Sequence, residues 1–229
     1  PLVHDEAATF FHYIHSFDFV PFIAHWDANN HILNSALASF FFWLFGPDEW
    51  VLRLPNLLAF PFYAWYIFKL GHFIHDHWIR ITFRFVLLLS HGVLEFFALS
   101  RGYGISMAAM AGALYALMQF QQTLQVKHLI ASLIAWTLAV LANLNLSTSY
   151  LLSLAWVFLL IVFFTQKMRA LNLIVWFFGL VSMAFFAVLA LELKKRGLLY
   201  YGAADGFWEI TVQTLIHMLF GFTHPLISV

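Results

Sequence analysis

Long apolar runs alternate with short polar segments over most of the chain. Six of these runs have roughly the 20 residues that a membrane-spanning helix needs: 54–71, 79–99, 104–121, 128–145, 148–165 and 171–191. They are continuous and lack the period-two alternation of membrane barrel strands. Because backbone polar groups in lipid must be paired within the protein, the pattern predicts an all-α fold, a polytopic transmembrane helical bundle.

A seventh apolar run, 31–46, is too short for an ordinary span. Its 16 residues would extend over roughly 24 Å as a helix, less than the ~30 Å of a hydrocarbon core. The run overlaps a polar start, "NNHILNS" at 29–35. We expect this helix to lie at the membrane surface. The alternative is a short span whose first turn is capped by Asn29 or Asn30.

Composition supports the membrane assignment and excludes several chemistries. The chain of 229 residues is 63% hydrophobic and 10% charged, whereas a soluble domain carries about 25% charged residues. The net charge is zero, so nothing indicates a nucleic-acid partner. The absence of cysteine excludes disulfides, thiolate metal sites and a cysteine nucleophile. No phosphate-binding loop, dinucleotide glycine motif or nucleophile elbow is present, which leaves ATP-driven transport and serine hydrolysis without support.

The basic residues indicate how the chain crosses the membrane. Those near the ends of the predicted spans gather on three loops, each separated from the next by two spans: Lys69, Arg80 and Arg84; Lys127; Lys167 and Arg169. An even number of crossings puts the three loops on one side, and the positive-inside tendency makes that side the cytoplasm. The segments 1–53, 100–104 and 145–149 then share the outer face with everything from about 192. The cations of "KKR" at 194–196 are an exception to this tendency.

This topology divides the chain into three parts. Residues 1–53 form an outer loop with two interfacial helices, residues 54–191 form a six-span bundle, and residues 192–229 form an outer loop and the start of a further helix. The sequence begins at Pro1 without an initiator Met, and we expect at least one further element before it.

Two acidic residues stand at the start of the predicted outer loop. Asp5 and Glu6 begin an amphipathic pattern whose apolar stripe includes Phe10, Ile14 and Phe17. Acids at a helix N-terminus complement the helix dipole, so capping is one interpretation. The other is a carboxylate at the membrane–water boundary that activates a hydroxyl or holds a cation.

Two groups of cations fall on the predicted outer face. Arg101 lies in "SRGYG", directly after a span, and is either an interfacial anchor or a phosphate ligand, a role that suits the guanidinium fork. Lys194, Lys195 and Arg196 follow the last predicted span. They are either ordinary flanking charges or partners of a lipid phosphate.

Histidines and one intramembrane pair offer further candidates. His91 and Glu95 lie one turn apart within an apolar run and are either functional or a pair that fixes helix packing. The groups "HYIH" at 12–15 and "HFIHDH" at 72–77 have spacings close to those of membrane di-iron enzymes. They lack the H-x-x-H-H form and fall on opposite predicted faces, which disfavours a redox cofactor bound by histidine.

The order of these segments resembles the GT-C membrane glycosyltransferases, in the branch of protein O-mannosyltransferases and lipid A aminoarabinose transferases. The resemblance is carried by "DEA" at 5–7, "NNHILNSALASFFFWLFGPDEWVLRLPNLLAF" at 29–60, "LSRGYGISMA" at 99–108 and the helical hairpins that follow. Within the second stretch, an apolar run ends in Phe-Gly and is followed by an acid and Arg-Leu-Pro. Ile32 replaces the proline that usually follows the histidine.

The resemblance implies that a sugar moves from a polyprenyl-phosphate donor to a hydroxyl or amine acceptor at the outer face. In such enzymes a carboxylate early in the first outer loop acts as base on the acceptor. That role would fall on Asp5, with Glu6 beside it as support. Arg101 and Tyr103 would form part of the donor site.

Further residues would assist on the same face. Asn30 and His31 would face the cleft between the outer loop and the membrane. Cations would gather around the leaving phosphate: Arg101, Lys194, Lys195 and Arg196. No residue is assigned as a metal ligand. Some GT-C enzymes use a divalent cation, so a cation cofactor is left open. The residues that could bind such an ion are Asp5, Glu6, His25 and Asp27.

The resemblance also implies a cellular setting. We expect an integral, multi-pass protein of the bacterial inner membrane, a cell-envelope enzyme whose site faces the periplasm. Its partners would be a lipid-linked sugar donor, a lipid, glycan or protein acceptor, membrane lipids and a membrane complex. The family has a span before the position of Pro1, further spans after about 207 and usually a soluble C-terminal domain.

Two other functions stay open from the sequence. The first is a non-catalytic GT-C-like membrane subunit that scaffolds a larger complex. The second is a transporter or lipid flippase, which several facing charges within the spans would favour. Only His91 and Glu95 supply such a pair.

Overall fold

The computed structural model describes residues 4–165 and 169–198. This part of the chain is helical and contains no strand, which confirms the predicted all-α class. Its elements in chain order are α1 His4–Thr9, η1 Phe10–Ile14, α2 Ile32–Phe45, α3 Glu49–Gly71, α4 His77–Leu89, α5 His91–Ala98, α6 Tyr103–Thr123, α7 Val126–Ala142, η2 Leu144–Leu146, α8 Ser147–Phe164 and α9 Arg169–Lys195.

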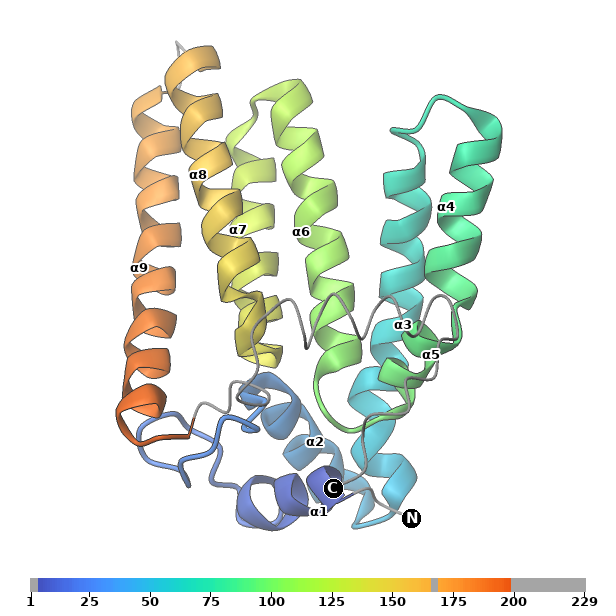
Figure 1. Cartoon of the computed structure of the whole chain (residues 1–229), viewed down its shortest axis with the longest axis vertical. Coiled ribbons are helices and arrows are strands. Elements are labelled where there is room, and N and C mark those ends of the chain that lie inside the picture. Colours follow the sequence, from blue (N-terminus) through green and yellow to red (C-terminus); the bar gives the residue numbers. More distant parts are fainter. Residues whose placement is uncertain (1–3, 166–168, 199–229) are drawn as a thin grey trace, which may run out of the picture.

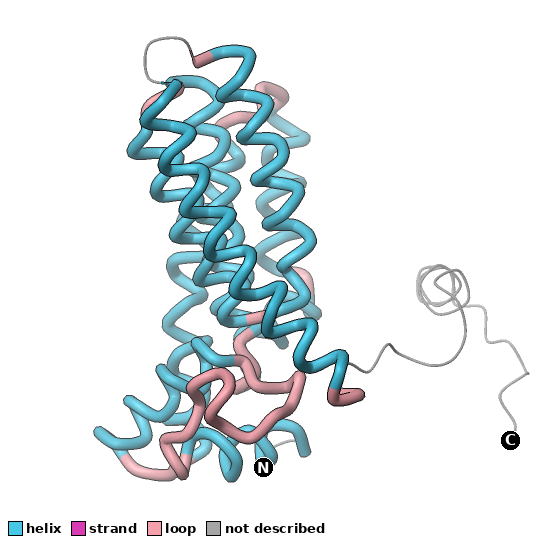
Figure 2. The backbone as a smooth tube through the Cα atoms, turned by 90° about the vertical axis from the view of Figure 1, so that its left-hand side faces the viewer, coloured by secondary structure: helices cyan, strands magenta, loops and turns pink. Residues whose placement is uncertain are grey.

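The long helices run along one common direction, and short elements lie across one end of them. Figure 1 shows α3, α4 and α6 to α9 side by side, with α1 and α2 together below them. The same arrangement is visible from the side in Figure 2. We call this the α1 end. The turns α3–α4 and α6–α7 lie at the opposite end (Figure 1). The segments 1–53, 100–104 and 145–149 are predicted on the outer face, and their described residues all lie at the α1 end.

Three helical segments are long and apolar enough to cross a membrane: Tyr103–Thr123, Leu144–Phe164 and Arg169–Lys195. The pair α4 and α5 would be a fourth if it forms one bent span. Helix α7 is apolar but has only 17 residues. Helix α3 has 23 residues but carries Arg53, Asn56 and Lys69 along its length. The described residues thus contain three or four candidate spans by this criterion.

The predicted span 79–99 is broken in the structure. Helix α4 ends at Leu89, Ser90 has an extended backbone, and α5 continues at an angle of 40°. Ser90 occupies the N-cap position of α5, although its side chain makes no capping hydrogen bond, and Gly92 lowers the helix propensity of the same segment. The continuous apolar pattern does not reveal this break.

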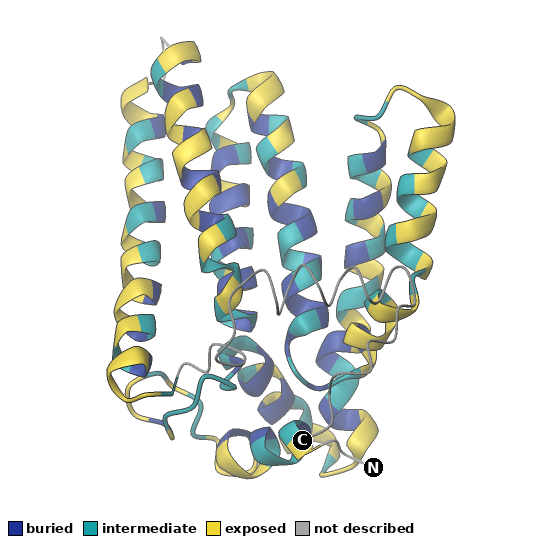
Figure 3. Ribbon diagram, in the orientation of Figure 1, coloured by how far each residue is buried: buried dark blue, intermediate teal, exposed yellow. Residues whose placement is uncertain are grey.

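The surface of the bundle is apolar, and much of its polar chemistry lies inside. Large side chains such as Trp43, Phe163 and Phe178 are at least two-thirds exposed. Figure 3 shows exposed residues along the outer sides of the long helices. Helix α2 is the clearest case, because its buried residues are small or polar: Asn34, Ser35, Ala38 and Ser39. This polarity suits a helix whose outer face meets lipid.

Three groups of buried side chains form the core. The largest joins α6 to α9 and includes Phe120, Trp136, Tyr150 and Phe186. A second joins α3 and α6 to α5 around Tyr63. A third, of Ile14, Ala38 and Leu52, packs η1 and α2 onto α3. The elements η1 and α2 are therefore attached to the bundle by an apolar contact.

Buried amides connect α2, α3 and the start of α6. Asn34 and Asn56 are both fully buried. The Asn56 amide donates to the Asn34 side-chain oxygen at 2.7 Å and accepts the Ile105 backbone N–H at 3.2 Å. The Asn34 amide donates to the Ser100 carbonyl at 3.1 Å. Because buried polar groups destabilise the fold when left unpaired, this network fixes α2 relative to the 99–102 turn.

We expect Asn56→Ala to destabilise the protein by roughly 3 kcal/mol, because it leaves the Asn34 oxygen and the Ile105 N–H buried without this partner. SDS-induced unfolding in mixed micelles would measure the change. Asn145→Ala is a matched control, since Asn145 is exposed, and should change stability by less than about 0.5 kcal/mol. Equal effects of the two substitutions would contradict the role of the network.

Candidate functional site

Glu6 forms a buried ion pair that joins three elements. Its side chain is completely buried. The carboxylate accepts hydrogen bonds from Arg53 Nε at 3.2 Å, Arg53 Nη2 at 2.9 Å and the Ser100 backbone N–H at 2.7 Å. The Ser100 hydroxyl donates in turn to the Leu52 carbonyl at 2.8 Å. Glu6 thereby holds α1 against α3 and against the turn before α6.

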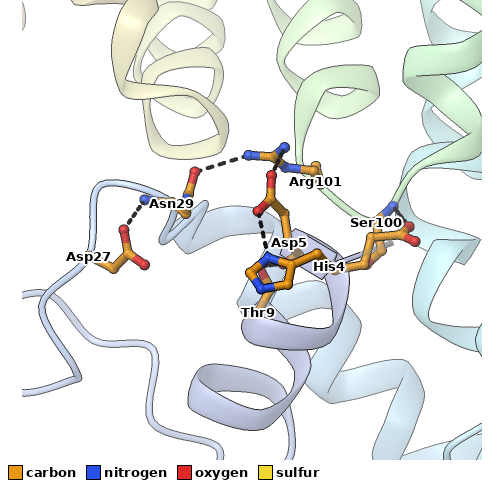
Figure 4. A network of polar contacts seen from close by, with 8 residues as sticks. His4, Asp5, Thr9, Asp27, Asn29, Ser100 and Arg101 are labelled. Atoms are coloured by element: carbon orange, nitrogen blue, oxygen red, sulfur yellow. Dashed lines mark hydrogen bonds and ion pairs between the residues drawn. The ribbon is translucent and has the colours of Figure 1, made fainter. Parts of the chain in front are cut away.

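Asp5 lies beside Glu6 in the chain but points to a different partner. Its carboxylate forms a short ion pair with Nη1 of Arg101, and Nη2 of Arg101 donates to the Asn29 side-chain oxygen at 3.0 Å. Asn29 is held by its own backbone N–H, which donates to Asp27 at 2.9 Å. Figure 4 shows these side chains converging from α1, the loop before α2 and the turn before α6. We call Asp5, Asn29 and Arg101 the Asp5–Arg101 cluster.

The cluster is only partly shielded from its surroundings. The Asp5 side chain is 38% exposed and that of Arg101 is 18% exposed. The Arg101 guanidinium lies over the Tyr103 ring at 5.3 Å. Arg101 Nε is buried and has no hydrogen-bond partner among the described residues. The guanidinium is therefore oriented by three contacts and still has an unused donor.

Gly102 allows the chain to pass between these residues and α7. Its φ of +69° is in the left-handed region, and a β-carbon there would lie 2.5 Å from the Ala142 carbonyl oxygen. Glycine alone combines that backbone with that distance. The close approach sets Arg101 and Tyr103 on either side of the contact with α7.

The His31 ring packs edge-on against the Tyr103 ring, beside the 99–102 turn. It is buried, its Nδ1 is 2.7 Å from the Ala142 carbonyl oxygen, and its ring centroid is 5.2 Å from that of Tyr103. Because a carbonyl can only accept, Nδ1 carries the hydrogen. Burial, assisted by the nearby Arg101 charge, lowers the His31 pKa to about 4 despite that hydrogen bond. His31 is neutral at pH 7, and its buried Nε2 has no partner among the described residues.

The structure separates the other predicted binding residues from this cluster. Asn30 accepts a hydrogen bond from the Ser35 hydroxyl at 3.3 Å and donates to the Phe19 carbonyl at 3.4 Å, so it faces the loop before α2. Lys195 pairs with Glu192 at 2.7 Å, and Lys194 is exposed. The described contacts do not join them to Asp5 or Arg101.

Arg196 is the exception among these cations, because it contacts the loop that supplies Asn29. Its guanidinium lies over the Trp26 ring at 4.1 Å. A small cavity of about 30 Å³ lies beside this contact, between the loop and helices α7 and α9, and is lined by Trp26, His25, Asn30 and Leu193 among others. Arg196 thus contacts a residue of this cavity, whereas Lys194, Lys195 and Arg196 are not themselves among the residues that line it.

The residues considered for a divalent cation do not converge. Within residues 4–165 and 169–198, no group of three or more His, Asp or Glu side chains could hold a metal ion. Asp5 and Glu6 bind different arginines. Asp27 accepts the Asn29 backbone N–H, and His25 stacks on the His12 ring at 4.4 Å. These four residues do not fit a common cation site in this structure.

His91 and Glu95 do not connect helices. They lie 3.9 Å apart on α5, with side chains 95% and 61% exposed. The interpretation as a pair that fixes helix packing is therefore wrong.

Sequence reasoning did not identify Asn29, Asn56 and Ser100 as parts of this region. Asn56 and Ser100 lie 49 and 94 positions from the residues that they bind, so no local pattern reveals the pairing. The small and polar face of α2 was detectable from the sequence. Asn34 and Ala38 are four residues apart, and so are Ser35 and Ser39, which is the spacing of one helix face.

The chain matches no family model, no curated protein and no solved structure.

The His31 environment predicts a specific loss of stability in acid. Because the folded pKa is about 4 and the ordinary value is 6.5, the unfolded chain binds more protons between these pH values. The stabilisation is therefore complete above about pH 6.5 and is lost as the pH falls to about 4. The shift corresponds to roughly 3 kcal/mol. Unfolding of wild type and His31→Gln in detergent at pH 7.5 and pH 4.5 would test it. The variant should lose less stability, and equal losses would contradict the assignment.

Proposed function

We propose that the chain is a glycosyltransferase that moves a sugar from a polyprenyl-phosphate donor to a hydroxyl or amine acceptor at the α1 end. The observation that carries the proposal is the pairing of Asp5 with Arg101, which are 96 residues apart in the sequence. The pair brings a candidate base and a candidate phosphate ligand together at a partly exposed position. The resemblance of the surrounding motifs to GT-C enzymes supports the same function.

The proposal includes a GT-C-like bundle of six spans, formed by α3, the bent pair α4–α5, α6, α7, α8 and α9. Helix α7 is short, but it packs against α6, α8 and α9 in the middle of the bundle. Alternating connections at the two ends (Figure 1) support six crossings. The α1 end would then face the periplasm of a bacterial inner membrane, where α2 lies at the lipid surface.

Arg101 would hold the phosphate of the donor. A guanidinium presents donors in a planar fork that matches two phosphate oxygens. Asn29 and Tyr103 hold the group in place. Phosphate competes with Asp5 for Nη1, so donor binding would release the Asp5 carboxylate from its ion pair. Negative charge on the departing polyprenyl phosphate is stabilised by the same guanidinium.

Asp5 would then act as the base. The acceptor oxygen or nitrogen forms a bond to the anomeric carbon, and the bond from that carbon to the phosphate oxygen breaks. The acceptor proton passes to Asp5, and the bonding electron pair leaves with polyprenyl phosphate. A single displacement of this kind inverts the anomeric centre, through a transition state that resembles an oxocarbenium ion. Glu6 is a positioning residue in this scheme, because its buried contacts with Arg53 and Ser100 hold α1 in place.

The full-length protein in detergent, supplied with a panel of polyprenyl-phosphate sugars, tests the proposal through release of polyprenyl phosphate. We expect Asp5→Asn to lower the rate by roughly 10²–10⁴-fold, the usual contribution of a general base. Arg101→Ala should lower it by roughly 10²–10³-fold. Asp48→Asn is the matched control, since Asp48 is an exposed acid of the same predicted outer loop, and its rate should stay within about twofold of wild type.

Three outcomes would overturn parts of this proposal. Release that survives Asp5→Asn would exclude Asp5 as the base. A rate that falls equally in Asp48→Asn would show a general effect of charge. Absence of release with every donor, from protein with an intact unfolding transition, would favour the non-catalytic subunit that scaffolds a larger membrane complex.

A further inference from the structure

A second polar site lies at the end of the bundle opposite α1. A pocket of about 390 Å³ opens between the end of α3, the turn that follows it and the end of α6. This volume is within the usual range of small-molecule pockets. Its polar lining consists of a lysine, two histidines, a tyrosine and two glutamines: Lys69, His72, His75, Tyr115, Gln119 and Gln122.

The pocket offers hydrogen-bond donors and positive charge. The Lys69 ammonium has three donors and each glutamine amide has two. The side chains of Lys69, Gln119 and Gln122 have no hydrogen bond or ion pair to other described residues. None of the described residues that line the pocket is an acid. Among the described residues of this end, Asp76 is the one acid, and its carboxylate already accepts the Ile79 backbone N–H at 2.8 Å.

Two carbonyl groups near the helix ends accept hydrogen bonds from protein side chains. The Phe68 carbonyl accepts from His72 Nδ1 at 2.8 Å and from Arg84 Nη2 at 3.0 Å. The Gln119 carbonyl accepts from the Thr123 hydroxyl at 2.8 Å. These two contacts reduce the number of acceptors that a cation could use. The preference for an anion rests on Lys69, the glutamine amides and the absence of an acid among the described lining residues.

Arg84 adds positive charge next to the pocket. Its guanidinium lies against the Gly71 backbone, where a β-carbon would be 2.6 Å from Nε, and over the Phe68 ring at 5.1 Å. Helix α4 thus carries a second cation to the same end of α3. Arg84 does not itself line the pocket, but its charge lies beside His72, which does, and the described lining residues include no acid.

The position along the bundle matches the level of lipid headgroups. The Lys69 ammonium lies 5.0 Å from the centre of the Trp65 ring, and Trp65 is 62% exposed. Exposed Trp beside Lys is typical of the membrane–water interface. We propose that this pocket binds a phosphate-bearing anion at the predicted cytoplasmic face, either the phosphate of an anionic lipid headgroup or a free phosphate ion.

The experiment compares two probes on the full-length protein in neutral detergent at constant ionic strength. The probes are short-chain phosphatidylglycerol and sodium phosphate, with short-chain phosphatidylcholine as a zwitterionic reference, and saturable shifts of the unfolding temperature give the apparent Kd. The variants are Lys69→Gln and Gln119→Leu, from different helices of the pocket. Lys127→Gln is the matched control, because Lys127 is an exposed lysine of the same end outside this lining.

We expect Lys69→Gln to weaken binding of an anionic probe roughly tenfold, the usual loss of one charge-assisted hydrogen bond. Gln119→Leu should weaken it several-fold, and Lys127→Gln should leave it within about twofold. If the two pocket substitutions weaken binding of phosphatidylglycerol but not of sodium phosphate, the ligand is a lipid headgroup. If they weaken binding of sodium phosphate alone, the ligand is a free phosphate ion.

The proposal fails if no anionic probe binds saturably, or if phosphatidylcholine binds as tightly as phosphatidylglycerol. It also fails if Lys69→Gln and Lys127→Gln weaken binding equally, because that result indicates only diffuse charge. If Lys69→Gln does not fold, Gln119→Leu decides in the same way. These readouts involve no glycosyl transfer, so they stand or fall independently of the function proposed for the Asp5–Arg101 cluster.

Discussion

The buried pairing of Glu6 with Arg53 is the contact on which the α1 end depends. A carboxylate completely removed from solvent is strongly destabilising unless donors surround it. Glu6 meets this requirement with both Arg53 nitrogens and the Ser100 backbone N–H. Because these donors come from α3 and the turn before α6, α1 can occupy one position against the bundle. Asp5, one residue earlier, is thereby fixed within reach of Arg101.

A second constraint comes from the inverted polarity of the helices. The side chains that α2 buries are small and polar, and those that it exposes are large and apolar. In water this arrangement would be unfavourable, because the hydrophobic effect would favour burial of Trp43 and Phe40. Against lipid no such force acts, and hydrogen bonds such as that between Asn34 and Asn56 can orient the helices instead. The same logic explains why an amide network, rather than an apolar contact alone, fixes the turn at Ser100.

Much of the architecture was predictable from the sequence, because the apolar period is a strong local signal. All six predicted runs are largely helical, although the run 79–99 breaks at Ser90 and the run 128–145 breaks at Asn143. Which loops lie together at the α1 end was also predictable, because it follows from counting the membrane crossings between them. The partner of Glu6 was not, because Arg53 lies 47 residues away and its motif gives no indication of a contact. Asn29 was identified only as a capping residue, whereas the structure binds it to Arg101.

The distribution of charge links the two polar sites. Six acids lie in the predicted outer loop: Asp5, Glu6, Asp18, Asp27, Asp48 and Glu49. Arg101 faces this acidic end and is held by Asp5, so each group of the pair is largely neutralised until a competitor arrives. A phosphate is such a competitor, because it offers the guanidinium two oxygens instead of one carboxylate contact. At the opposite end the balance is reversed, and Lys69 has no acid among the residues that line its pocket. An anion there would meet a cation without an acidic partner directly. At the α1 end, an anion must first displace Asp5 from Arg101. That displacement is what would couple donor binding to release of Asp5 as the base.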